Sequence, residues 1–342
     1  MPQQPETSLE TFHFRNLPPQ ILIGTASDRY AGWIGQIYSS DRYEGRIIRR
    51  TKIIAGKTFV EEVLPVDSLE EYFEHFPVLE IDFTFYRPLL TDGKPTQNYR
   101  VLNTYARHLK DRDRLILKVP QMTMAQKIRK GGLFIENQAY LNPKIFTEQF
   151  YDPAVTLLGA NLTGFIFEQE YQRKEDRTPV VEMARALDKF FRAIPKDSRY
   201  HLELRTDLYL REPIFEVLDR HGIGQVLSHW TWLPPLRKQL AKADGRFFNK
   251  ECVIRLLTPL GMRYDDSYEK TYPFDGLVEE MLQPEMILET VEIMKTAVEK
   301  GLAINVIINN RVGGNAPMIA RLIVEKFIGK SRSGPKGQLD LW

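Results

Sequence analysis

Apolar runs and amphipathic segments alternate along most of the chain. The clearest example lies near the C-terminus, where the β-branched run 303–308 is followed by two asparagines, a glycine pair and an amphipathic segment that begins after Asn315. The run fits a strand buried on both faces, and Asn315 is suited to cap a helix with Pro317 in its first turn. Seven similar units precede this one, so the pattern predicts an α/β fold, a TIM-type (β/α)8 barrel. The expected strands are residues 20–25, 78–86, 114–120, 162–170, 200–207, 224–231, 251–258 and 303–309.

The barrel is expected to form one domain over residues 20–329, between a polar leader at 1–19 and a disordered tail at 330–342. The repeating pattern breaks once, at 39–66, where charged and apolar residues alternate and predict an inserted hairpin. Six basic residues in this insertion would suit contacts with phosphates or with an acidic partner. The simpler alternative is a solvated excursion that has no partner.

Composition places the chain among ordinary globular proteins, with 43% hydrophobic and 27% charged residues in a total of 342. No apolar run is long enough to span a membrane, and the first residues lack the pattern of a signal peptide. A cytoplasmic protein without a membrane partner is therefore expected. The net charge of +2 is too small to indicate nucleic-acid binding by itself. The single cysteine, Cys252, excludes an intrachain disulfide and stands in an apolar run that favours a packing role.

Polar residues recur at alternate positions near the ends of the expected strands. Period-two alternation along 78–86 places four polar side chains on one face and apolar ones on the other; the four are Glu80, Asp82, Thr84 and Tyr86. The apolar face of a barrel strand packs under the helices, so the polar face is expected to point inward. Buried carboxylates require cations, and other strands supply them. The predicted inward ring consists of Glu80, Asp82, Lys118, Glu203, Arg205, Arg255 and Asn309.

Carboxylates set against lysine and arginine can serve as general acid and base. We therefore predict an enzyme of hydrolase or isomerase type that acts on a small polar, sugar-like or phosphorylated molecule. Glu80 or Glu203 would transfer protons, with Asp82 nearby, and the cations of the ring would hold the anion. The alternative is a network of salt bridges that serves structure alone.

Two further features near the strand ends suggest chemistry. His229 ends the sixth expected strand, where a base would lie. A divalent metal held by Glu80, Asp82 and Glu203 is the less favoured alternative, because His229 is the one plausible nitrogen ligand, and no cofactor is assigned. The Gly313–Gly314 turn before the last helix is expected to bind phosphate through backbone N–H groups, unless it needs glycine only for its geometry.

Two aromatic-rich loops border this end of the expected barrel. The segment 259–283 is predicted to form a lid over the site. The loop after the first strand carries Trp33 and Tyr38, which either contact substrate or plug the mouth of the barrel.

The ordered set of these residues resembles the YecE-like family, the domain-of-unknown-function family number seventy-two. The resemblance spans most of residues 21–328 and rests on Gly24-Thr25 with Tyr30, Trp33, Gly35 and Tyr38; Glu80 with Thr84-Phe-Tyr86; Lys118-Val-Pro120; Gln169; Glu203-Leu-Arg205; Arg255; and Asn309-Asn310 with Gly314, Ala316-Pro317 and Ala320.

This resemblance implies a TIM-type barrel with a polar site at its C-terminal face, and it supplies no reaction. The family pattern usually has histidines where this chain has Met124, Thr206 and Leu257, so an activity that uses those histidines would be altered here. Further residues expected at the substrate site are Tyr30, Trp33, Tyr86, Gln169, Asn309, Asn310 and Gly314.

The last five residues carry a separate signal. Gln338, Leu339, Asp340, Leu341 and Trp342 resemble the bacterial peptide that binds the sliding clamp, with Trp342 in place of phenylalanine. Two leucines and a terminal aromatic on a flexible tether can dock in an apolar groove, with the glutamine bonding at its edge. The alternative function is therefore a non-catalytic, nucleic-acid-associated factor that is recruited through this tail and uses the basic insertion.

Overall fold

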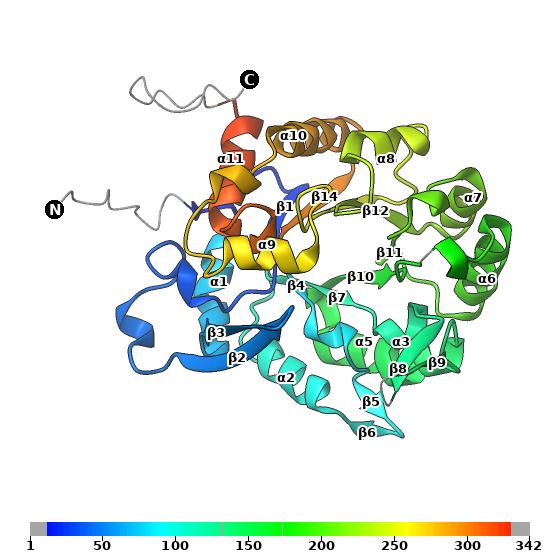
Figure 1. Ribbon diagram of the computed structural model, residues 1–342, viewed down its shortest axis with the longest axis horizontal. Helices are drawn as coiled ribbons and strands as arrows, with labels where there is room; N and C mark the ends of the chain where they lie inside the picture. Colours follow the sequence, from blue (N-terminus) through cyan, green and yellow to red (C-terminus); the bar gives the residue numbers. More distant parts are fainter. Residues whose placement is uncertain (1–11, 131–132, 173, 330–342) are drawn as a thin grey trace.

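Eight parallel strands close into a barrel in the computed structural model, which describes residues 12–130, 133–172 and 174–329 (Figure 1). The order around the barrel is β1-β14-β13-β12-β11-β10-β7-β4, and β4 pairs back with β1. The predicted (β/α)8 barrel is therefore confirmed. Its strands are β1 (Ile21–Ala26), β4 (Val78–Ile81), β7 (Arg114–Lys118), β10 (Leu162–Glu168), β11 (Tyr200–Glu203), β12 (Gly224–His229), β13 (Glu251–Leu256) and β14 (Ala303–Ile308).

Helices surround the barrel (Figure 1). The last helix begins as expected, because the Asn315 side chain accepts a hydrogen bond from the backbone N–H of Met318 at 2.9 Å. The helices are α1 (Leu69–His75), α2 (Gln97–Ala106), α3 (Gln121–Met124), α4 (Pro143–Phe146), α5 (Asp152–Leu158), α6 (Val180–Ala193), α7 (Glu212–His221), α8 (Leu236–Lys242), α9 (Tyr264–Thr271), α10 (Pro284–Glu299) and α11 (Ala316–Phe327).

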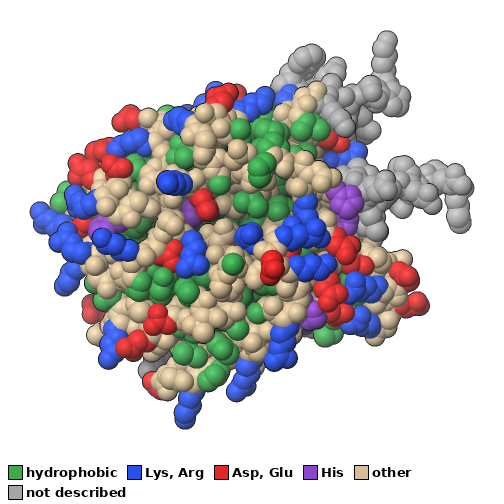
Figure 2. Space-filling view, turned by 180° about the vertical axis from the view of Figure 1, so that it is seen from behind, with side chains coloured by type: hydrophobic (Ala, Val, Ile, Leu, Met, Phe, Trp, Pro, Cys, Tyr) green, Lys and Arg blue, Asp and Glu red, His purple; other side chains and the backbone are tan. Residues whose placement is uncertain are grey.

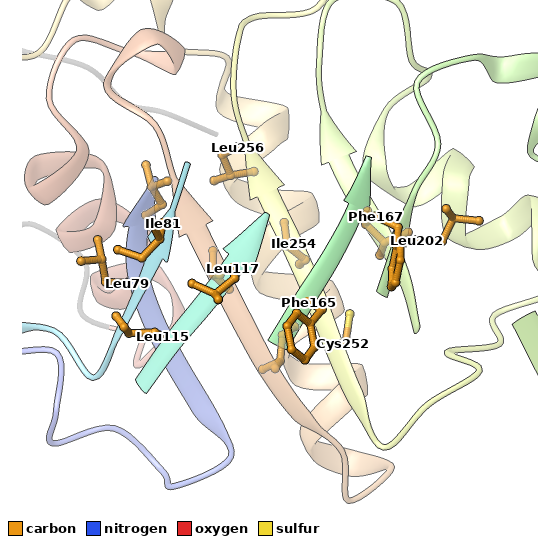
Figure 3. Packing of buried hydrophobic residues seen from close by; sticks show 14 of the residues in the cluster. Leu79, Ile81, Leu115, Leu117, Phe165, Phe167, Leu202, Cys252, Ile254 and Leu256 are labelled. Atoms are coloured by element: carbon orange, nitrogen blue, oxygen red, sulfur yellow. The ribbon is translucent and has the colours of Figure 1, made fainter. Parts of the chain in front are cut away.

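The two faces of each barrel strand pack in different cores. Outward-facing side chains pack between the strands and the helices, as Figure 3 shows for residues such as Leu79, Leu117 and Phe167. Cys252 belongs to this outer core, where burial raises the pKa of its thiol to about 12, in keeping with a packing role. A separate inner cluster fills the barrel with Ala26, Val78, Ile116, Ile166, Val226, Val253 and Ile307.

The inward face changes from apolar to charged toward the carboxyl ends of the strands. Residues two apart on a strand share a face, so the positions that follow the inner cluster also point inward. Closure of the barrel between β1 and β4 depends on Gly24, because a Cβ there would lie 2.1 Å from the carbonyl oxygen of Val78 on β4. The inward positions beyond the cluster hold Glu80, Lys118, Glu168, Ser228 and Arg255.

The 39–66 insertion contains the antiparallel hairpin of β2 (Ile48–Ile54) and β3 (Lys57–Val63). It packs on α9, where the ring of Phe59 lies 5.1 Å from that of Tyr268. The segment expected to be a lid thus contains a helix that is joined to the insertion, and both lie on the same side of the barrel (Figure 1). Two shorter hairpins are β5 (Leu90–Thr91) with β6 (Lys94–Pro95), and β8 (Lys127–Lys130) with β9 (Leu133–Glu136).

The molecular surface carries both signs of charge. Figure 2 shows basic and acidic side chains interspersed over the face seen from behind, with apolar patches between them. None of the helices in the described ranges is both long enough and apolar enough to cross a membrane.

Candidate active site at the carboxyl end of the barrel

Three carboxylates and three cations form one network at the carboxyl end of the barrel. Arg255 donates to both oxygens of Glu80, at 2.7 and 2.6 Å, and also donates to Glu203. Lys118 and Arg205 share one oxygen of Glu168, at 2.6 and 2.9 Å. The network therefore links Glu80, Lys118, Glu168, Glu203, Arg205 and Arg255.

This network joins five of the residues predicted for the inward ring and adds one that the sequence reasoning missed. The resemblance indicated Gln169, and alternation along the expected strand 162–170 does not by itself show whether Glu168 or Gln169 faces inward. In the structure Glu168 stands beside Glu203 in the strand register. Gln169 instead accepts a hydrogen bond from the backbone N–H of Arg205 at 3.1 Å and helps to hold the loop. Ile166 belongs to the inner cluster, and Glu168 lies two residues later on the same strand, so Glu168 also points into the barrel.

The three carboxylates of the network differ in their electrostatics: burial raises the pKa of Glu80 against the opposing charge of Arg255. Glu80 and Glu203 are fully buried. The second oxygen of Glu203 accepts a hydrogen bond from Ser228. Burial alone would raise the pKa of Glu168, but the charges of Arg205, Lys118 and Arg255 hold it well below its usual range. Proton transfer by Glu80 or Glu203 is disfavoured, because both oxygens of each accept hydrogen bonds within the network.

The expected alternation along 78–86 is wrong beyond Ile81. Strand β4 ends there, and residues Phe83–Phe85 form one 3-10 turn. Thr84 consequently donates to the carbonyl oxygen of Lys118 at 2.7 Å, while Tyr86 is 77% exposed. Asp82 lies outside the charge network, at the edge of a neighbouring cavity.

His229 also lies apart from the network. Its neighbour Ser228 is the inward residue, and His229 turns to the other face of β12, where its Nδ1 lies 2.9 Å from the carbonyl oxygen of Thr258. Burial lowers the pKa of His229 to about 4. The ring is therefore neutral at physiological pH and is not placed to act as the predicted base.

The turn after β14 does not provide the expected phosphate site. The backbone N–H groups of Gly313 and Gly314 both donate to the carbonyl oxygen of Asn310, at 3.2 and 2.6 Å. Gly314 has a φ of +101°, and a Cβ there would lie 2.3 Å from the carbonyl oxygen of Gly276. The glycine pair thus serves the geometry of the turn and the close approach of a neighbouring loop.

The two asparagines of this turn hold the turn itself. The Asn310 side-chain oxygen accepts hydrogen bonds from the backbone N–H of Ala316 at 2.8 Å and from the indole of Trp33 at 3.2 Å. Asn309 accepts from the backbone N–H of Arg311 at 3.0 Å. Trp33 is fully buried, so it fits the alternative interpretation of a plug rather than a substrate contact.

A cavity of about 1500 Å³ opens beside the charge network. The ends of β1 and β4, the β2–β3 hairpin and the loop 272–276 enclose it. Tyr30, one of the residues expected at the substrate site, lines it. The ionisable residues of its wall include Asp28, Arg29, Asp41, Arg50, Lys52, Glu61, Glu62, Glu80 and Asp82.

Asp28 is the ionisable group of this wall whose pKa is most suited to proton transfer. It is 3% exposed and accepts a hydrogen bond from the hydroxyl of Tyr105 at 3.1 Å. Burial raises the pKa of Asp28 to about 6, and the charge of Asp82 adds to this rise while Arg29 opposes it. The sequence offered one weak signal, an acidic residue in the loop after the first strand, which lies at the catalytic end of such barrels.

Three arginines near the cavity form no ion pair with the described residues. Arg29 and Arg50 line the cavity wall. Arg311 stacks on the ring of Tyr264 at 4.3 Å. Burial raises the pKa of Tyr30 and the charge of Arg311 opposes this rise, so Arg311 also lies close to the cavity.

The other basic residues of the hairpin are neutralised. Lys52 lies 3.0 Å from Glu61, and Arg49 lies 3.0 Å from Glu62. The hairpin therefore offers the cavity one uncommitted cation, Arg50, within the described part of the chain.

The alternative metal site is not assembled. Glu80 and Glu203 are bound to Arg255, and Asp82 lies apart from both. Across the described ranges, no group of three or more histidine, cysteine, aspartate or glutamate side chains is placed to hold a metal ion.

Comparison with known proteins places the chain in one family. The model of the family described as "Protein of unknown function DUF72" matches residues 22–338. A DUF72 family protein from Enterococcus faecalis has a TM-score of 0.54 and 17% identity, covering 94% of this chain and 100% of its own. A DUF72 family protein from Thermotoga maritima has a TM-score of 0.54 and 17% identity, covering 91% and 99%. No curated protein matches the chain.

Proposed function

The chain belongs to the DUF72 family of proteins of unknown function, and we propose that it is an enzyme that transfers protons on a phosphate-bearing substrate in the cavity beside β1 and β4. One observation carries this proposal. A buried carboxylate with a pKa of about 6, Asp28, lies in the wall of a large cavity that also holds Arg29 and presents Arg50, a cation with no ion pair among the described residues. A group with a pKa near neutrality is an efficient general base, and an unpaired guanidinium is a natural partner for phosphate.

Under this proposal, the residues of the cavity have distinct roles in proton transfer and in phosphate binding. Asp28 accepts a proton from the substrate or from an attacking water, and the protonated Asp28 then returns that proton to the leaving oxygen or to the product. The charge of Asp82 in the same cavity wall contributes to the raised pKa of Asp28. Arg29 and Arg50 hold the phosphate. Arg255 and its partner carboxylates fix the barrel end on which these loops rest. Hydrolysis of a phosphate ester and isomerisation of a sugar phosphate both need such a base, so both reaction types fit the site.

Activity assays separate the two reaction types. Release of p-nitrophenol from p-nitrophenyl phosphate reports hydrolysis, whereas incorporation of deuterium from D2O into a sugar phosphate, followed by NMR, reports proton abstraction from carbon.

Arg50→Ala is expected to weaken the binding of inorganic phosphate by about 10- to 150-fold, because a hydrogen bond to a charged group contributes roughly 1.5–3 kcal/mol. Titration calorimetry of the intact chain measures this. The matched control is Arg46→Ala, which removes another arginine of the insertion that is 46% exposed and paired with Asp67, a residue outside the cavity wall. Absence of phosphate binding by the wild-type chain, or equal weakening by both variants, would contradict the proposed anion site.

A second candidate function rests on the tail. Residues 338–342 lie outside the described residues, so the support is the sequence pattern alone. Under this hypothesis, the chain is a nucleic-acid-associated factor that binds a sliding clamp through Gln338, Leu339, Leu341 and Trp342. Most cations of the insertion are neutralised by neighbours, which leaves the tail as the feature that favours this function.

Removal of residues 338–342 is expected to abolish micromolar binding to a bacterial sliding clamp, because the two leucines and the tryptophan supply the apolar anchors. Calorimetry with the intact and shortened chains measures this. Identical heats for the two chains would remove the clamp from consideration.

A further inference from the structure

Three aromatic rings stand together at the mouth of the barrel, where the adjacent strands β10, β11 and β12 end. The ring of Tyr171, which follows β10, lies 6.1 Å from that of Trp230 and 6.2 Å from that of Trp232, which both follow β12. Tyr171 is 41% exposed and Trp232 is 48% exposed. We call these three rings the aromatic platform. Exposed rings that are ordered against one another offer flat apolar faces to a ligand.

The aromatic platform is joined directly to the charge network. The guanidinium of Arg205, which follows β11, covers one face of the Trp230 ring at 4.7 Å, and its Nη2 lies 2.9 Å from Oε2 of Glu168. This contact brings the Glu168 carboxylate next to the platform, with one arginine between them. Because the rings are held in place before a ligand arrives, less free energy is lost in ordering them.

Glu168 and Arg205 both keep polar atoms free beside the rings. The hydrogen bonds that Glu168 accepts from the described residues all fall on Oε2. The Glu168 side chain is 15% exposed and its Oε1 is not enclosed by protein, so this oxygen is open to the mouth. Nε of Arg205 is buried without a hydrogen-bond partner among the described residues. A buried donor without a partner is costly, so a ligand oxygen that accepts from Nε recovers free energy.

The balance of charge at the network favours a neutral ligand. Its three carboxylates and three cations neutralise one another. An anion would have to compete with the carboxylates that Arg205 already holds, and a cation would be repelled by Arg205 over the Trp230 ring. A neutral sugar has a face of C–H groups that packs on aromatic rings, and its hydroxyl groups both donate and accept hydrogen bonds. These properties match the open rings, the free acceptor of Glu168 and the free donor of Arg205.

We propose that the aromatic platform, together with Glu168 and Arg205, binds a neutral sugar. One face of the sugar stacks on the rings of Tyr171 and Trp232. One hydroxyl donates to Oε1 of Glu168, and another oxygen accepts from Arg205. None of the residues of this site lines the cavity beside β1 and β4. The sugar site therefore goes beyond the proposed function and does not depend on it.

Trp232→Leu tests the sugar site, because leucine keeps an apolar side chain and removes the most exposed ring of the platform. The probes are the methyl glycosides of glucose, galactose, mannose, xylose and N-acetylglucosamine, titrated with the full chain and followed by saturation-transfer NMR. At least one of them is expected to bind. Trp232→Leu is expected to weaken that binding by about fivefold or more, because truncation of an aromatic anchor commonly has an effect of this size. Tyr171→Leu should act in the same direction.

The matched control is Tyr264→Leu. Tyr264 follows β13 and is 40% exposed, but its ring packs on Arg311 instead of on the charge network. Its removal should leave the affinity for the glycoside unchanged. Equal weakening by Tyr264→Leu and Trp232→Leu would contradict the sugar site.

The remaining outcomes separate the sugar site from the proposed function. Weaker glycoside binding in Trp232→Leu with unchanged binding of inorganic phosphate supports two independent sites. If none of the glycosides binds the wild-type chain, the platform is not a sugar site, and the proposed function is unaffected. If adenosine binds more tightly than every glycoside and loses this advantage in Trp232→Leu, the rings receive a base and the sugar assignment is wrong. If the wild-type chain binds a glycoside but not inorganic phosphate, the sugar site stands and the proposed function fails.

Discussion

Arg255→Met is expected to lower the free energy of unfolding by about 3–5 kcal/mol near pH 7. Arg255 is 3% exposed and contacts all three carboxylates of the network. Methionine fills part of the same volume but leaves Glu80 and Glu203, both fully buried, without their main counter-charge. The cost is the desolvation of charges that have lost their partner. Equilibrium unfolding in urea, followed by circular dichroism, measures it.

The pH dependence identifies the cause of this loss. Burial already raises the pKa of Glu80, and the charge of Arg255 opposes this rise. Without Arg255, the pKa of Glu80 is expected to rise further above that of the unfolded chain. A carboxyl whose pKa is raised by folding binds its proton more tightly in the native state, so stability falls as the pH rises through that window. The deficit of Arg255→Met should therefore be largest near pH 8 and smaller near pH 5. A cavity left by the shorter side chain would give the same deficit at both values.

Two comparison variants complete this test. Replacing Glu80 and Glu203 by glutamine together with Arg255→Met removes the uncompensated charges and should recover much of the loss. Arg49→Met breaks a surface pair and should change stability by less than about 0.5 kcal/mol. A loss below about 1 kcal/mol in Arg255→Met would contradict the network as described.

The sequence was sufficient to predict the barrel and most of its inner charges, because both follow from strong physical constraints. Eight apolar runs separated by amphipathic segments leave few other folds. A charge such as Arg255 within an aliphatic run must find an opposite charge on the inward face. Glu80 and Glu203 are among the carboxylates predicted on that face, and the structure pairs Arg255 with both.

The remaining site residues depend on where strands end and how loops fold, which local patterns do not determine. Strand β4 ends at Ile81, so Asp82 and Tyr86 do not lie on the inward face that alternation predicted for them. His229 was predicted to face the site from the end of β12, but its neighbour Ser228 is the inward residue and bonds to Glu203. Asp28 gains its raised pKa from burial by segments remote in sequence, such as the helix that carries Tyr105. The local sequence 27–30 therefore does not predict that Asp28 is buried or that its pKa is raised.

Asp28→Asn is expected to lower kcat/KM by about 10²–10⁴-fold on whichever phosphate-bearing substrate the assays identify, the range for removal of a general acid or base. The asparagine keeps the size of the side chain and an oxygen that can accept from Tyr105, but it cannot take up a proton. In the wild-type enzyme, kcat/KM should rise with pH through about 6, where Asp28 loses its proton. Steady-state rates between pH 4.5 and 8.5 measure both effects.

The same substitution is expected to stabilise the fold at neutral pH, which distinguishes a catalytic role from a structural one. The pKa of Asp28 is raised by folding, so its ionisation costs stability as the pH rises from about 4 to about 6, and the cost persists above that range. Asp28→Asn removes this cost and should raise the free energy of unfolding near pH 8 by roughly 1–3 kcal/mol. Below pH 4 the two proteins should be about equally stable. An inactive variant that is also less stable at pH 8 would show that Asp28 supports the loop rather than the reaction, and unchanged activity would exclude it as the base.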